Sequence, residues 1–168
     1  MTHNSKIRLI VVNALVAAAY IVLSTGPAAI NMASGAIQFR ISEGLNHLVI
    51  FNKKYIWGVV GGVLIFNALF SSLGWLDIVF GGGQSLIGLL LVGYLAPHLK
   101  QVWQRYVLNI LVMTVSMFLI AIELHIAYKL PFWPTYGTTA LSEFIIMAVT
   151  APIMAAVDRA VHFKKQVD

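Results

Sequence analysis

Long apolar runs alternate with short polar stretches along the chain, and this pattern predicts a bundle of membrane-spanning helices. An α-helix needs about 20 mostly apolar residues to cross the hydrocarbon core. We expect six helices, at about residues 7–26, 42–52, 55–73, 75–97, 103–128 and 140–163. The second run is short, so it is either a broken span or a span that starts deep inside the protein.

Proline and glycine mark the expected helix ends, because proline removes a backbone hydrogen bond. Gly26-Pro27 is expected to close the first helix and Pro97 the fourth, while Pro152 predicts a kink in the last. The composition agrees with a membrane protein, since only 10% of the residues are charged, against about 25% in soluble domains. We expect one membrane domain over residues 1–168, with the first apolar run retained as a helix rather than removed as a signal peptide.

The distribution of lysine and arginine predicts the orientation. With six spans, both termini lie on one side, and that side would carry nine basic residues: Lys6, Arg8, Lys53, Lys54, Lys100, Arg105, Arg159, Lys164 and Lys165. The other side would carry Arg40 and Lys129. The positive-inside rule therefore predicts cytoplasmic termini. The net charge of +5 belongs to loops and helix ends, so we expect no nucleic-acid partner.

The loops expected outside, at 27–41, 73–77 and 129–139, hold an unusual set of side chains: Arg40, Trp75, Asp77, Trp133 and Tyr136. Their gathering at one face predicts a pocket open to the outside. The aromatic residues have a second reading, as part of the belt at the membrane interface. The stretch "PFWPTYG" has the composition of a stiff aromatic lid over a flat ring.

Polar residues inside the apolar runs are the other candidates for the pocket. Asp77, Gly81, Gln84, Ser85 and Gly88 recur at spacings of three and four and share one helical face. This face either lines a pocket or forms a small-residue packing seam. If the face is a packing seam, the helix dipole accounts for Asp77, because negative charge is favoured at the start of a helix.

The stretch "RISEGLNH" places ionisable groups next to an apolar run. Ser42 suits a helix N-cap, and Glu43 would then lie in the first turn, where negative charge is favoured. Capping does not account for Arg40, Asn46 and His47, and an ionisable group at membrane depth is a functional-site candidate. We expect Ser42 to cap the helix and direct Glu43 into the pocket, with Arg40 pairing with that acid or holding the loop.

Two further acids have competing interpretations. Glu143 follows Thr138 and Thr139, either of which would cap the last helix and leave the acid stabilised by the dipole. Glu123 lies near the outer end of its helix, where it either points into the pocket or sits at the interface beside Lys129.

Small residues four apart allow close helix approach. Ala14 and Ala18 in the first helix, and Gly58 and Gly62 in the third, either pack inside the bundle or dock another membrane subunit. There is no cysteine, no Walker-type loop, no His-x-x-x-His pair and no Gly-x-Ser-x-Gly elbow. We therefore expect no metal, no cofactor and no enzymatic activity, but a binding protein that works through partners.

Three stretches carry a resemblance to a known family: "AIQFRISEGLNHL", "NALFSSLGWLDIVFGGGQSLIG" and "TALSEFIIM". They resemble the substrate-binding S components of energy-coupling factor (ECF) transporters, most closely the QueT-type queuosine-precursor family. The similarity covers nearly the whole chain. Ser72 and Ser85 stand where that family commonly has proline and threonine.

The resemblance implies an all-α, six-transmembrane-helix S-component bundle in a bacterial cell membrane, with both termini cytoplasmic. It implies a transmembrane coupling subunit, docked by Ala14 and Ala18, and two cytoplasmic ATPases. The implied substrate is a deazaguanine such as aminomethyl-deazaguanine or queuine. The expected substrate-binding residues are the acids Glu43, Asp77, Glu123 and Glu143, the amides Asn46, Asn67 and Gln84, the aromatics Trp75, Trp133 and Tyr136, and Arg40. The alternatives are an S component for riboflavin or thiamine, a small membrane enzyme with Glu43 or His47 as base, and a structural subunit.

Overall fold

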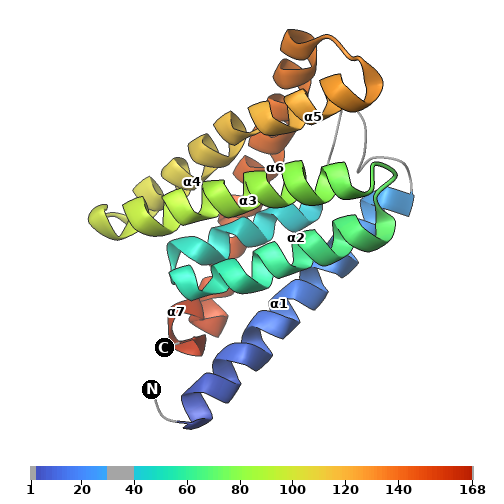
Figure 1. The fold of residues 1–168 in the computed structure, drawn as a ribbon. Coiled ribbons are helices and arrows are strands. Elements are labelled where there is room, and N and C mark those ends of the chain that lie inside the picture. The colour runs from blue at the N-terminus through green and yellow to red at the C-terminus, as the bar shows by residue number, and fades with distance from the viewer. Residues whose placement is uncertain (1–2, 30–39, 168) are drawn as a thin grey trace.

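The computed structural model describes residues 3–29 and 40–167, and within them every regular element is a helix (Figure 1). Three of these elements are 3₁₀ helices, labelled η. In chain order the elements are α1 (His3–Ala29), η1 (Ile41–Ile50), η2 (Lys53–Tyr55), α2 (Ile56–Phe70), α3 (Trp75–Leu95), η3 (Ala96–His98), α4 (Val102–Ser116), α5 (Phe118–Tyr128), α6 (Phe132–Val161) and α7 (Phe163–Gln166).

Five stretches of the described residues are long and apolar enough to cross a membrane: Ser5–Gly26, Lys53–Phe70, Trp75–His98, Val102–Tyr128 and Phe132–Val161. They confirm five of the six predicted spans as helical. The run at 42–52 forms η1 instead, a 3₁₀ helix of ten residues. At about 2 Å per residue such a segment is roughly 20 Å long, which is less than the roughly 30 Å of the hydrocarbon core.

The short η1 segment lies in the interior of the bundle. Most of its residues are buried, including Leu48, Val49 and Ile50 in the main hydrophobic core. It packs on α6 and α1, and Gly44 permits the close approach to α6. A Cβ atom at Gly44 would lie 2.8 Å from the Thr150 side chain. Helices on several sides therefore enclose a segment that is itself too short to span.

Both ends of the described chain lie at the same end of the bundle (Figure 1). The Arg8 guanidinium donates to Gln166 Oε1 at 2.8 Å. The Lys54 ammonium donates to the Val167 carbonyl at 2.6 Å, and the Tyr55 hydroxyl to the Phe163 carbonyl at 2.8 Å. This arrangement agrees with termini on one side of the membrane. Which side is cytoplasmic stays a prediction.

The two pairs of small residues have different surroundings. Gly58 and Gly62 pack inside the bundle against α1, and the Gly58 amide donates to Asn13 Oδ1 at 2.7 Å. Ala14 and Ala18 are exposed on the outer face of α1. The glycine pair is therefore a helix-packing contact, while the alanine pair is available to a partner or to lipid.

The prediction of a loop at 129–139 is wrong for most of these residues, because α6 begins at Phe132. Pro131 and Pro134 are compatible with this start, since the first amides of a helix have no intrahelical acceptor. Thr138 and Thr139 consequently lie inside the helix and do not cap it. The Thr139 hydroxyl donates to the Thr135 carbonyl at 2.9 Å, and Glu143 lies far from the first turn.

Two other boundaries differ from the prediction. Helix α1 continues to Ala29, past Gly26-Pro27, because a proline in the last turn removes only one backbone hydrogen bond. The predicted helix at 103–128 is divided at Met117 into α4 and α5, with the Met117 amide donating to the Thr114 carbonyl. Pro152 lies inside α6 as expected, and its kink stays a prediction.

Candidate functional site

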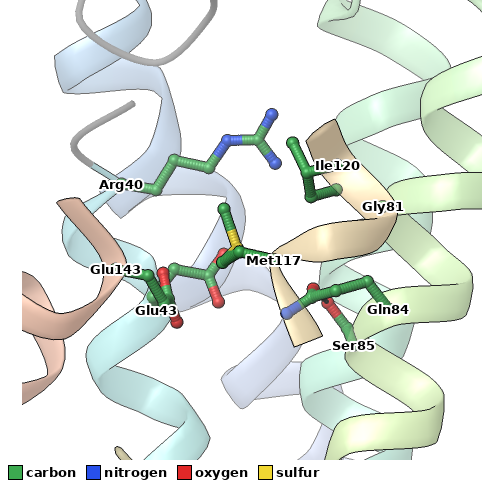
Figure 2. A pocket seen from close by; sticks show the side chains of 8 residues that line it. All are labelled: Arg40, Glu43, Gly81, Gln84, Ser85, Met117, Ile120 and Glu143. Atoms are coloured by element: carbon green, nitrogen blue, oxygen red, sulfur yellow. Dashed lines mark hydrogen bonds between the residues drawn. The ribbon is translucent and has the colours of Figure 1, made fainter. Parts of the chain in front are cut away.

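A small polar cavity lies among η1, α3, the α4–α5 junction and α6 (Figure 2). Its lining consists of Arg40, Glu43, Gly81, Gln84, Ser85, Met117, Ile120 and Glu143. The cavity volume is about 20 Å³, which is room for about one water molecule. The elements that enclose it must therefore separate before a larger ligand can enter.

Two carboxyl groups lie side by side at one wall of the cavity (Figure 2). Glu43 on η1 is held firmly, because one of its oxygens accepts from the Tyr20 hydroxyl and the other accepts from Asn46 Nδ2 at 2.7 Å. Glu143 on α6 is also buried, and its Oε1 has no hydrogen-bond partner among the described residues. One acid is thus fixed in place and the other retains hydrogen-bonding capacity.

The predicted capping role of Ser42 is wrong. Arg40 is the residue that precedes the first turn of η1, and no side chain caps this end. Ser42 lies inside the turn, where its hydroxyl accepts from the Ser24 hydroxyl of α1 at 2.7 Å. A contact between two distant segments, rather than a local cap, therefore sets the position of Glu43.

Arg40 extends over the cavity from the start of η1 (Figure 2). Its guanidinium carbon lies 5.8 Å from the centre of the Phe66 ring. Burial lowers the pKa of Arg40, but Tyr20, Glu43 and Asp77 outweigh this effect and raise the pKa above its usual value. Arg40 also interacts electrostatically with Glu123 and Glu143. One permanent cation therefore faces four carboxyl groups.

These four carboxyl groups dominate the electrostatics of the site, since the chain has only six acidic residues. With a single arginine among them, the region favours a ligand that carries positive charge or several N–H donors.

The second pair of acids lies beside this cavity and does not line it. Asp77 accepts from the Ser71 hydroxyl, and Asn67 donates to the Asp77 backbone carbonyl at 2.8 Å. The Glu123 side chain lies next to that of Asp77 and is 1% exposed. Neither Glu123 oxygen has a hydrogen-bond partner within the described residues. Glu123 is therefore a buried acid with unused acceptors beside a partly buried one.

The predicted face of α3 forms another wall of the cavity. Gly81, Gln84, Ser85 and Gly88 are buried together, as their spacing indicated, while Asp77 is partly buried at the start of the helix. Gln84 Nε2 donates to the Ser116 hydroxyl at 2.8 Å, and its Oε1 accepts from Ser85 at 3.1 Å. The amide of Gln84 is therefore oriented by neighbours on both sides.

His47 is engaged at both ring nitrogens. Its Nε2 lies 2.9 Å from the Met147 carbonyl, which only accepts, so this nitrogen carries the hydrogen. Its Nδ1 then accepts from Asn109 Nδ2 at 3.0 Å. His47 is a buried structural residue in this arrangement and does not line the cavity.

The predicted aromatic residues lie elsewhere. Trp75 and Trp133 are 68% and 76% exposed, as expected of residues in an interfacial belt. Tyr136 is partly buried, and its ring stacks on Phe132 with a centroid distance of 6.1 Å. None of the three lines the cavity in this conformation, so their role in stacking on a ligand stays a prediction.

Sequence reasoning missed Tyr20, Met117 and Ile120. A signal for Tyr20 existed, because Asn13, Tyr20 and Ser24 are spaced by seven and four, and all three are buried on one face of α1. Met117 and Ile120 carry no signal of this kind, since they are ordinary apolar residues in an apolar run.

The fold and the site together define a membrane protein with an acidic cavity enclosed by its helices. The chain belongs to the QueT transporter family, whose model matches residues 10–159. It is 37% identical to a protein of Lactococcus lactis subsp. cremoris (strain MG1363) named "Queuosine precursor transporter QueT", over 96% of this chain and 99% of that protein. No solved structure matches the chain. As a member of a transporter family, the chain is not an enzyme.

Proposed function

We propose that this chain is the substrate-binding S component of an ECF importer in a bacterial cell membrane, and that it takes up a queuosine precursor. The substrate is aminomethyl-deazaguanine or queuine. The observation that carries the proposal is the acidic cavity, found in a chain whose relative is named for queuosine precursors. The class of ligand that an acidic, amide-lined cavity favours is a flat, N–H-rich, cationic heterocycle.

Glu43 and Glu143 are the residues best placed to bind the guanine-like edge. This edge presents adjacent N–H groups, and a single carboxylate accepts two of them in a bidentate, charge-assisted pair. Glu143 has an unused oxygen, while Tyr20 and Asn46 fix the geometry of Glu43. The Gln84 amide, across the cavity, is suited to the carbonyl and ring nitrogens of the base.

Asp77 and Glu123 are suited to the ammonium group that distinguishes these precursors from guanine. A buried carboxyl oxygen without a hydrogen-bond donor is unfavourable, at about 1–3 kcal/mol or more for each group. An aminomethyl group would supply donors and positive charge together. An ammonium between the two acids would give the Glu123 oxygens the hydrogen-bond donors that they lack among the described residues.

Transport also requires partners. The chain contains no Walker-type phosphate loop, so ATP hydrolysis belongs to two cytoplasmic ATPases, acting through a transmembrane coupling subunit. The exposed pair Ala14 and Ala18 is the proposed docking surface for that subunit. Substrate is captured from outside, the cavity closes, and the loaded subunit reorients against the coupling subunit.

Calorimetry on the purified chain in detergent tests the proposed substrate. The ligand panel is aminomethyl-deazaguanine, queuine, guanine, riboflavin and thiamine. We expect tight binding of at least one deazaguanine and much weaker binding of guanine, which lacks the ammonium group. Tight binding of riboflavin or thiamine, without binding of either deazaguanine, would keep the S-component assignment but contradict the proposed substrate. Absence of binding by every ligand would favour a structural subunit.

A further inference from the structure

A second cavity, of about 690 Å³, lies at the end of the bundle that holds the termini. It is formed where the junction of η1 and η2 meets the end of α3, and it is bounded by α4 and α7. It shares no lining residue with the acidic cavity. The proposed transport function makes no use of it.

The polar lining of this second cavity is basic. Lys53, Arg105, Lys164 and His98 contribute to it, and no carboxylate is among the described residues that line it. Arg105 is held in place because its Nε and Nη2 both donate to the Leu99 carbonyl, at 3.1 and 3.0 Å. The cavity therefore gathers positive charge around one arginine that is held in place.

A neighbouring cavity of about 470 Å³ extends the basic region. This neighbouring cavity shares Arg105 and Lys164 with the 690 Å³ cavity and adds Lys165. Its one acid, Asp158, accepts from the Phe163 amide at 2.9 Å. The wider region thus keeps an excess of positive charge.

Apart from Asn52, the rest of the lining is mainly apolar, and it reaches the membrane-facing surface of α3. Leu90 and Tyr94 are 52% and 70% exposed, and both lie in the candidate span Trp75–His98. Gly93 lets α3 approach the stem of Lys53, because a Cβ atom there would lie 3.2 Å from Lys53 Cβ. An apolar wall inside the span is thus continuous with a basic rim at its end.

We propose that this cavity binds one anionic phospholipid, with its phosphate held by Lys53, Arg105 and Lys164 and an acyl chain along Leu90 and Tyr94. Basic pockets between transmembrane helices at the membrane surface bind anionic headgroups in this way. The apolar wall favours a lipid over a free phosphate ion, which would use only the rim.

Native mass spectrometry of the purified chain tests the proposal, with phosphatidylglycerol, phosphatidylcholine and glycerol 3-phosphate as separate probes. We expect phosphatidylglycerol to bind most tightly. The double variant Lys53→Gln/Lys164→Gln should weaken its binding roughly 30-fold, since each lysine near an anionic headgroup contributes about fivefold in affinity.

The matched control is Lys100→Gln/Arg159→Gln, which removes the same charge from exposed positions at the same end of the bundle. The control should bind phosphatidylglycerol as the wild type does. Equal weakening in both double variants would overturn the proposal, because it would indicate attraction to the basic end as a whole. Equal affinity for phosphatidylcholine, or for glycerol 3-phosphate, would also overturn it.

Discussion

The most informative residue is Glu43, because three segments of the chain converge on it. Tyr20 of α1 and Asn46 of η1 fix its carboxylate, while Glu143 of α6 lies beside it. Such an arrangement orients the Glu43 carboxylate before a ligand arrives, so ligand binding costs little side-chain conformational entropy at this residue.

Replacing Glu43 with glutamine therefore tests the site directly. Glu43→Gln keeps the shape but loses the charge and one acceptor, and a hydrogen bond to a charged group contributes about 1.5–3 kcal/mol. We expect a 10- to 100-fold weaker affinity for the deazaguanine, measured by calorimetry. Asp158→Asn is the control, since it makes the same chemical change outside the acidic cavity. Wild-type affinity in Glu43→Gln would remove this acid from the binding site.

Arg40 is expected to stabilise the closed cavity. Its raised pKa means that folding favours the charged form, a contribution that is present at all working pH values and lost only as pH rises through that pKa. Arg40→Gln removes the cation that interacts with the four nearby acids, so we expect a melting temperature several degrees lower than that of the wild type.

Lys129→Gln is the control for this effect, since it removes an exposed cation on the far side from the termini without touching the acids. An equal fall in melting temperature in Lys129→Gln would contradict the explanation that Arg40 acts on these acids.

At the scale of elements, the contact between α1 and α2 sets the position of Tyr20. A Cβ atom at Gly58 would lie 2.8 Å from the Asn13 carbonyl oxygen, which is backbone and cannot move alone. Gly58→Ala should therefore push the two helices apart and destabilise the protein by about 1–3 kcal/mol, measured by thermal unfolding with and without ligand.

Gly61→Ala provides the matched control on the same helix, because nothing lies within 4 Å of a Cβ atom there. Alanine favours helix over glycine by up to about 1 kcal/mol, so Gly61→Ala should be neutral or slightly stabilising. Equal destabilisation by both substitutions would show that the Gly58 contact is not specific.

The elements also show where sequence reasoning succeeded. Five spans were predictable because the length of an apolar run is a local property. The start of α6 was not, since one proline just before the helix and one in its first turn look like a loop although they are compatible with a helix. Ser42 was misassigned because its partner, Ser24, lies on another helix. Acids stand out in an apolar sequence, whereas Met117 enters the cavity only through the break between α4 and α5.

At the scale of the whole molecule, the outer face of α1 is expected to bind the coupling subunit. Ala14→Leu/Ala18→Leu adds bulk there, and we expect loss of co-purification with that subunit but unchanged ligand affinity. The control, Ala156→Leu/Ala160→Leu, changes two exposed alanines with the same spacing on α6. Equal loss of the complex in both would argue against docking through α1.

The predicted orientation is testable by labelling, because the chain has no cysteine of its own. Lys129→Cys and Lys100→Cys introduce single thiols at exposed positions at opposite ends of the bundle. In intact cells a membrane-impermeant thiol reagent should label Lys129→Cys and leave Lys100→Cys unmodified until the cells are opened. The reverse pattern would place the termini outside.

The unusual winding of η1 has a geometric consequence for the closed cavity. Ten residues rise about 20 Å as a 3₁₀ helix but only about 15 Å as an α-helix. Rewinding this one segment would shorten it by about 5 Å and turn each residue by about 20° less than before. Arg40 and Glu43 lie at its beginning, so such a change of pitch would draw the cation and the fixed acid along the axis together. The difference in length of η1 between 3₁₀ and α winding is therefore comparable to the rise of one α-helical turn.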